Sequence, residues 1–101
     1  MGDYNHISKM EKIFDEAKRR QTALEIAIAD YKNFQPSIKE LEKYYSSKQW
    51  KDDFAADERG EIPSYIKRGV LSEDGIYDLL ERNKEIMDML DSLDKEEEKG
   101  T

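Results

Sequence analysis

Cysteine is absent from the sequence, and its absence removes several kinds of chemistry at once. No disulfide can stabilise the fold, and no thiolate is available as a nucleophile or as a zinc ligand. His6 is the single histidine, so a catalytic triad or a zinc site would depend on one side chain near the N-terminus. We therefore expect no catalytic residue and no cofactor. The lack of disulfides also fits a reducing cytoplasm.

The sequence also lacks an excess of positive charge and a long apolar run. Its 17 basic and 24 acidic residues give a net charge of −7. Direct binding to nucleic acid or to an anionic membrane is therefore disfavoured, because both need a cationic surface. No apolar segment is long enough to span a bilayer. The acidity indicates either a well-solvated surface or attraction to a basic partner protein.

Residues 6–34 and 76–93 contain no glycine or proline, and apolar residues recur there at steps of three and four. This period is that of an amphipathic helix. Residues 1–5 are polar and are expected to be frayed, and a first helix is predicted over about residues 6–34. Its stripe consists of Ile7, Met10, Phe14, Ala17, Gln21, Leu24, Ile28 and Tyr31, widened by Ile13, Ala27 and Phe34.

The breaks fall in the middle of the chain. Pro36 is suited to the first turn of a second, short helix. Ser47 can cap a third helix that carries Trp50 and Phe54 on one face, and Gly60 can end it. The alternative is one continuous helix over residues 37–59, because two serines disfavour a helix only mildly.

Residues 61–71 are predicted to be irregular, and a last helix follows them. Pro63 pushes Ile62 toward an extended backbone, and Gly69 supplies a turn. Ser72 is followed by two carboxylates, which is typical of a helix start. The last helix has a stripe made of Ile76, Leu79, Leu80, Asn83, Ile86, Met87, Leu90 and Leu93.

These elements predict an all-α fold with one helical domain over residues 6–94 and a charged, disordered tail over residues 95–101. The two long helices are expected to form an antiparallel hairpin, with the short helices and the Pro/Gly loop packed across one end. With Ile28 beside Ile76, the polar residue of each stripe meets the other, so Gln21 faces Asn83. A buried amide pair costs stability but fixes the register. The alternative is that one or both amides face solvent.

A cluster of acidic residues is the candidate for a metal site. Asp53 and Asp57 lie four residues apart and share a helix face, and Glu73 is a possible further ligand. Such carboxylates can bind Mg²⁺ or Mn²⁺. The simpler interpretation is a solvated acidic face paired with nearby lysines and arginines. The spacing does not match an EF-hand loop.

The aromatic residues of the middle segment are the candidates for a contact surface. Trp50 and Phe54 are expected to be core residues. Tyrosine and arginine are enriched at protein interfaces. The surface that we expect combines such residues with neighbouring acids: Tyr44, Tyr45, Asp57, Glu58, Tyr65 and Arg68.

Three strings in this middle segment carry a family resemblance. They are Y-Y-x-S-x-x-W-x-x-D-F (Tyr44 to Phe54), D-E-x-G-x-x-P (Asp57 to Pro63) and K-R-G-V-L-S-E-D-G-I-Y-D-L-L (Lys67 to Leu80). Over about residues 7–92 the chain resembles the bacterial domain-of-unknown-function family 4298. The resemblance implies a small cytoplasmic bacterial protein. It assigns no catalytic or binding residue, because the family has none assigned.

The function expected from the sequence is that of a small acidic adaptor that acts by contact with a protein partner, which could be a second copy of itself. One alternative is a metal-dependent enzyme that uses the acidic cluster. Another is an acidic decoy that mimics nucleic acid and binds a basic protein. Metal-dependent melting would distinguish the first alternative, and salt-dependent association would distinguish the second.

Overall fold

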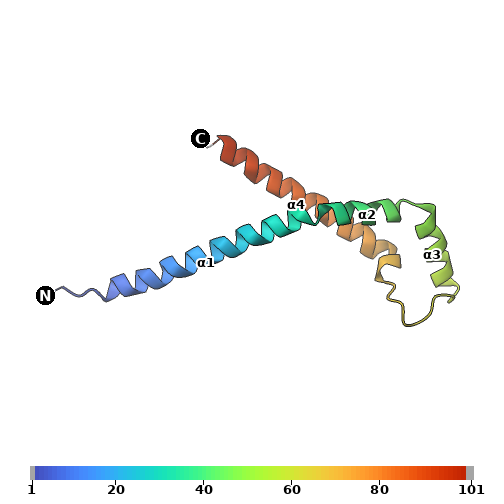
Figure 1. The fold of residues 1–101 in the computed structure, drawn as a ribbon, viewed down its shortest axis with the longest axis horizontal. Coiled ribbons are helices and arrows are strands. Elements are labelled where there is room, and N and C mark those ends of the chain that lie inside the picture. Colours follow the sequence, from blue (N-terminus) through green and yellow to red (C-terminus); the bar gives the residue numbers. More distant parts are fainter. Residues whose placement is uncertain (1, 100–101) are drawn as a thin grey trace. The chain divides into compact units, whose positions relative to one another are not determined.

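The computed structural model describes residues 2–99, and the side chains of residues 2–95 (Figure 1). Its elements are the helices α1 (Asn5–Asn33), α2 (Gln35–Tyr45), α3 (Lys48–Glu58) and α4 (Glu73–Lys99), together with the short 3-10 helix η1 (Gly69–Leu71). Residues 2–99 contain no strand, so the all-α prediction is confirmed. The chain divides into two units, Met1–Ser37 and Ile38–Thr101.

Helix α1 makes up most of the first unit. It begins at Asn5, whose backbone N–H donates to the Asp3 carboxylate at 3.0 Å. It ends at Asn33, because Pro36 has no N–H to continue the ladder of helical hydrogen bonds. No residue of Asn5–Asn33 is buried. The stabilising contacts within α1 are local, such as the ion pairs of Glu16 with Arg19 and Arg20.

The second unit has a core of its own. Five apolar side chains are buried there, and they come from all four of its elements: Ile38, Trp50, Leu71, Ile76 and Leu80. After α3 the chain returns through an irregular segment to η1 and the start of α4 (Figure 1). This segment lets α3 and α4 both pack against η1.

The breaks between the short helices lie where the sequence predicts them. Helix α2 ends at Tyr45 and α3 begins at Lys48, so residues 37–59 are two helices and not one. Ser47 Oγ accepts from the backbone N–H of Trp50 at 3.2 Å and caps α3. Gly60 has a φ of 71°, a left-handed conformation that favours glycine and ends α3.

Helix α4 begins as predicted and runs further than predicted. Ser72 Oγ accepts from the backbone N–H of Gly75 at 3.2 Å, which caps the helix. The helix continues through Lys99, whereas the sequence placed a disordered tail from Lys95. Residues 100–101 of that predicted tail lie outside the described residues. Residues 95–99 are lysine and glutamate, which favour helix, and the next glycine is residue 100.

The hairpin of the two long helices and the pairing of Gln21 with Asn83 stay predictions. No helix within residues 2–99 has both the length and the apolar character that a membrane span needs.

Candidate functional site

Trp50 attaches the irregular segment to α3. Its side chain is 7% exposed, and its indole N–H donates to the carbonyl oxygen of Val70 at 3.0 Å. The indole stacks on Phe54 with a centroid distance of 5.2 Å, and it meets Tyr45 edge-on at 5.0 Å. One buried ring thus contacts α2, α3 and η1, and its single polar atom has a partner.

The irregular segment is shaped by two local features. Pro63 O accepts from the backbone N–H of Ile66 at 3.0 Å, which closes a turn. Arg68 O then accepts from the N–H of Leu71 at 2.9 Å, which forms η1 and turns Leu71 into the core. The backbone is therefore fixed at both ends of the segment, although the segment has no regular structure between them.

An open pocket of about 440 Å³ lies between α3 and this segment. Apolar side chains supply much of its lining: Ile62, Pro63, Ile66, Val70 and Leu71. Two of these are accessible from solvent, because Ile66 is 45% exposed and Val70 is 36% exposed. The pocket therefore offers apolar surface to a ligand without any rearrangement of the core.

Charged groups surround the apolar lining in equal numbers of each sign: Asp53, Glu61, Lys67 and Arg68. Arg68 Nη1 donates to Asp57 Oδ1 at 3.1 Å, which ties the segment to α3. Arg59 Nε donates to Glu61 Oε1 at 2.7 Å, and this hydrogen bond holds the pKa of Glu61 below its ordinary value. A balanced rim around an apolar centre is the usual arrangement of a protein-binding surface.

Tyr44 and Asp53 form a polar pair at the edge of the pocket. The Tyr44 hydroxyl donates to Asp53 Oδ2 at 2.6 Å, and Gln49 Nε2 donates to Asp53 Oδ1 at 2.8 Å. Burial, with the hydrogen bond and the negative charge of Asp53, raises the pKa of Tyr44 to about 12. Tyr44 therefore stays protonated at neutral pH and acts as a donor, not as a base or a nucleophile.

The candidate metal ligands are not gathered at one place. Within residues 2–99, no group of three or more histidine, cysteine, aspartate or glutamate side chains is placed to hold a metal ion. Each oxygen of Asp53 accepts a hydrogen bond from Tyr44 or Gln49, and Asp57 pairs with Arg68. Glu73 is the first residue of α4 and is exposed. Carboxylates with these partners favour the structural interpretation of the acidic cluster.

The residues predicted for a contact surface occupy different environments. Tyr44 and Arg68 line the pocket, and Tyr45 packs on Trp50. Glu58 is exposed at the end of α3, and Tyr65 is 84% exposed in the irregular segment.

The sequence interpretation did not select the apolar residues Ile62 and Ile66. They flank Pro63 at the position where the turn presents both side chains to the pocket. The available signal was the pair of isoleucines, four residues apart, around a proline.

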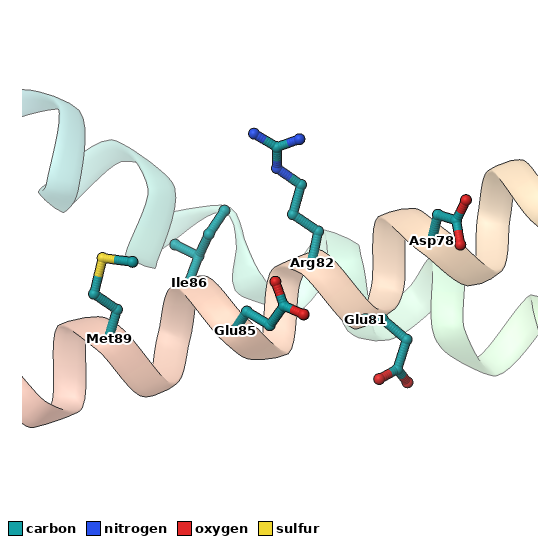
Figure 2. A pocket seen from close by; sticks show the side chains of 6 residues that line it. All are labelled: Asp78, Glu81, Arg82, Glu85, Ile86 and Met89. Atoms are coloured by element: carbon teal, nitrogen blue, oxygen red, sulfur yellow. The ribbon is translucent and has the colours of Figure 1, made fainter.

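A second hollow lies along α4. Its lining residues are Asp78, Glu81, Arg82, Glu85, Ile86 and Met89, and every one of them belongs to this helix. Figure 2 shows Arg82, Ile86 and Met89 on one side of α4 and Glu81 on the other. One helix supplies all six side chains, so this hollow is a helix face. Four of the six side chains are charged, and none of the six comes from a second element that would enclose a small ligand.

Comparison with known proteins identifies one family. A family model described as a domain of unknown function (DUF4298) matches residues 7–92, which include the whole pocket. No curated protein and no solved structure matches the chain. The match confirms the resemblance read from the strings between Tyr44 and Leu80.

Proposed function

The chain belongs to this family of domains of unknown function, and we propose that it is a small non-enzymatic adaptor that binds a protein partner through the pocket beside α3. The observation that carries the proposal is the open pocket of about 440 Å³ with its partly exposed apolar lining. An apolar side chain of the partner would enter this pocket, while the surrounding charges would set its orientation.

The contacts around the pocket support a binding surface more than a reaction site. Tyr44 is held as a hydrogen-bond donor, and the carboxylate of Asp53 accepts from two neighbours. Neither residue is paired with a histidine or a thiol, since the chain has one histidine at position 6 and no cysteine. An adaptor needs none of these, because exposed apolar surface next to ordered charges is enough for binding.

The test compares two substitutions that add the same charge to an exposed apolar side chain. Ile66→Lys places a cation in the pocket, and Met89→Lys places one on α4, where the side chain is 61% exposed. Beads that carry each full-length variant, or the wild-type protein, are incubated with lysate, and the retained proteins are quantified by mass spectrometry.

We expect the proteins retained by the wild-type chain to be retained by Met89→Lys and lost with Ile66→Lys. Circular dichroism of both variants checks that their helices are intact. Equal retention by all three proteins would refute the proposed role of the pocket.

A further inference from the structure

Helix α1 presents a long apolar stripe that its own unit does not cover. We call the residues Ile7, Met10, Phe14, Ala17, Gln21, Leu24, Ile28 and Tyr31 the α1 seam. Its large side chains are open to solvent: Ile7, Met10, Phe14 and Leu24 are each at least 50% exposed. An isolated helix gains little stability from such a stripe, which is typical of a helix packed on another helix.

We propose that the α1 seam is covered by α1 of a second copy, which runs antiparallel to the first. The seam is complementary to itself when it is reversed. Ile7 then faces Tyr31 of the second copy, Met10 faces Ile28, Phe14 faces Leu24, and Ala17 faces Gln21. A two-fold axis repeats each layer, so every seam position has a partner in a self-complementary interface.

The charges on one edge of the seam favour this arrangement. Helical side chains point back toward the N-terminus of their helix, so flanking side chains of antiparallel helices lean toward one another. This geometry brings Lys18 toward Glu25 of the second copy and Glu11 toward Lys32. Symmetry repeats both contacts, which gives four pairs of opposite charge along one edge of the seam. On the other edge Ile13 lies beside Ala27, and the same register brings Arg20 of each copy together. Each Arg20 already pairs with Glu16 of its own helix at 2.8 Å, which offsets part of their repulsion.

A parallel pair would use the same seam less well. Each layer would place identical residues together, so Gln21 would meet Gln21 and Phe14 would meet Phe14. Lys18 would then lie beside Ile13 of the second copy and would lose its carboxylate partner. The antiparallel register instead places the amide of Gln21 beside the small Ala17.

Helix α4 of the same chain is the competing occupant. The hairpin register with Ile28 beside Ile76 needs Ile76 and Leu80 as seam residues, and these are 3% and 7% exposed in the core of the second unit. The same register places Met10 beside Asp94. The second copy therefore places apolar residues against the N-terminal half of the α1 seam, where α4 would place a charged one.

The experiment uses charge reversal at one flanking pair. The mass of the full-length chain is measured by sedimentation equilibrium from micromolar to millimolar concentration, for the wild type, Lys18→Glu, Glu25→Lys and the double variant. A fifth sample is an equimolar mixture of the two single variants. Both positions are on the exposed surface of α1, so helicity is expected to be retained and is checked by circular dichroism.

We expect the wild type to form a dimer, and each single variant to raise the dissociation constant about tenfold, because two attractive contacts become repulsive. The double variant and the mixture should both recover wild-type association, since each restores opposite charges at both contacts. Recovery in the mixture is specific to the antiparallel pair of α1 helices.

Three results would overturn the proposal. A monomer mass at every concentration would leave α4 as the occupant of the α1 seam. A dimer that is insensitive to both single variants would place the interface elsewhere. Single variants that weaken the dimer without recovery in the mixture would exclude the antiparallel register.

Discussion

Helix α1 and the second unit, residues 38–99, consist of the same kind of amphipathic helix but differ in what stabilises them. The second unit buries five apolar side chains, and a serine directly before α3 and another directly before α4 cap the helix backbone. No residue of Asn5–Asn33 is buried, and Tyr4 at the start of α1 provides no side-chain cap. The periodicity of a stripe therefore indicates that a helix has an apolar face, and it does not show where that face is buried.

The difference follows from what connects the helices. The second unit has turns, caps and an aromatic anchor that bring its short helices together within the same stretch of chain. Trp50 alone contacts Tyr45, Phe54 and the carbonyl of Val70. Helix α1 has no glycine or proline within it to turn the chain back on its stripe, and no residue of Asn5–Asn33 is buried.

The largest effect is expected when the Trp50 side chain, the aromatic anchor of the second unit, is removed. We expect Trp50→Ala to lower the free energy of unfolding of the second unit by about 3–5 kcal/mol, because a buried aromatic ring and its contacts are lost. Ile26→Ala is the matched control, since Ile26 is 63% exposed on α1 and lies outside the α1 seam. Urea unfolding followed by circular dichroism measures both variants. A loss of similar size in Ile26→Ala would contradict the difference between the two regions.

A smaller effect is expected at the end of α3. Gly60 has a φ of 71°, so Gly60→Ala should cost about 1–2 kcal/mol in the second unit, although a Cβ there meets no atom within 4 Å. Gly69→Ala is the control, because its Cβ would also meet open space and its backbone is not left-handed. Urea unfolding of the two variants separates backbone strain from steric contact. Equal effects would show that the left-handed conformation does not specify the turn.

Replacing serine by alanine should change stability in opposite directions in the two regions. We expect Ser47→Ala to destabilise the second unit by about 1 kcal/mol, because the N–H of Trp50 loses its capping acceptor. Ser8→Ala should instead stabilise α1 by up to about 0.5 kcal/mol, because Ser8 lies inside the helix and alanine has the higher helix propensity. Thermal melting of the two variants reports on both. A destabilising effect at Ser8 would indicate a capping role that α1 does not show.

The positions of the helices were predictable from the sequence because local chemistry determines them. Pro36, Ser47, Gly60 and Ser72 each act through their own backbone or hydroxyl, and each lies at the break that was assigned to it. The end of α4 was the exception. Its charged residues were interpreted as a solvated tail, although lysine and glutamate also favour helix and α4 reaches Lys99.

The candidate site was less predictable, because it depends on contacts between distant residues. Tyr44 and Arg68 were selected for their type, and both line the pocket. The hydrogen bond from Trp50 to Val70 spans twenty positions and decides which side of the segment faces α3. The place of Ile62 and Ile66 around Pro63 marks them as residues of a turn, but without that contact the local sequence does not show that they face the pocket.

The smallest predicted effect concerns the polar edge of the pocket and depends on pH. Tyr44→Phe removes the donor to Asp53 and should cost roughly 0.5–1 kcal/mol at neutral pH, since Tyr44 is half-buried and water can replace part of the bond. The pKa of Tyr44 is raised to about 12 in the folded state, so folding favours the protonated hydroxyl. This contribution is complete below the unfolded pKa of about 10 and is lost as the pH rises from there toward 12. Urea unfolding from pH 7 to 11 should therefore show a steeper loss of stability above pH 10 in the wild type than in Tyr44→Phe. Parallel curves would mean that Tyr44 ionises as freely in the folded chain as in the unfolded one.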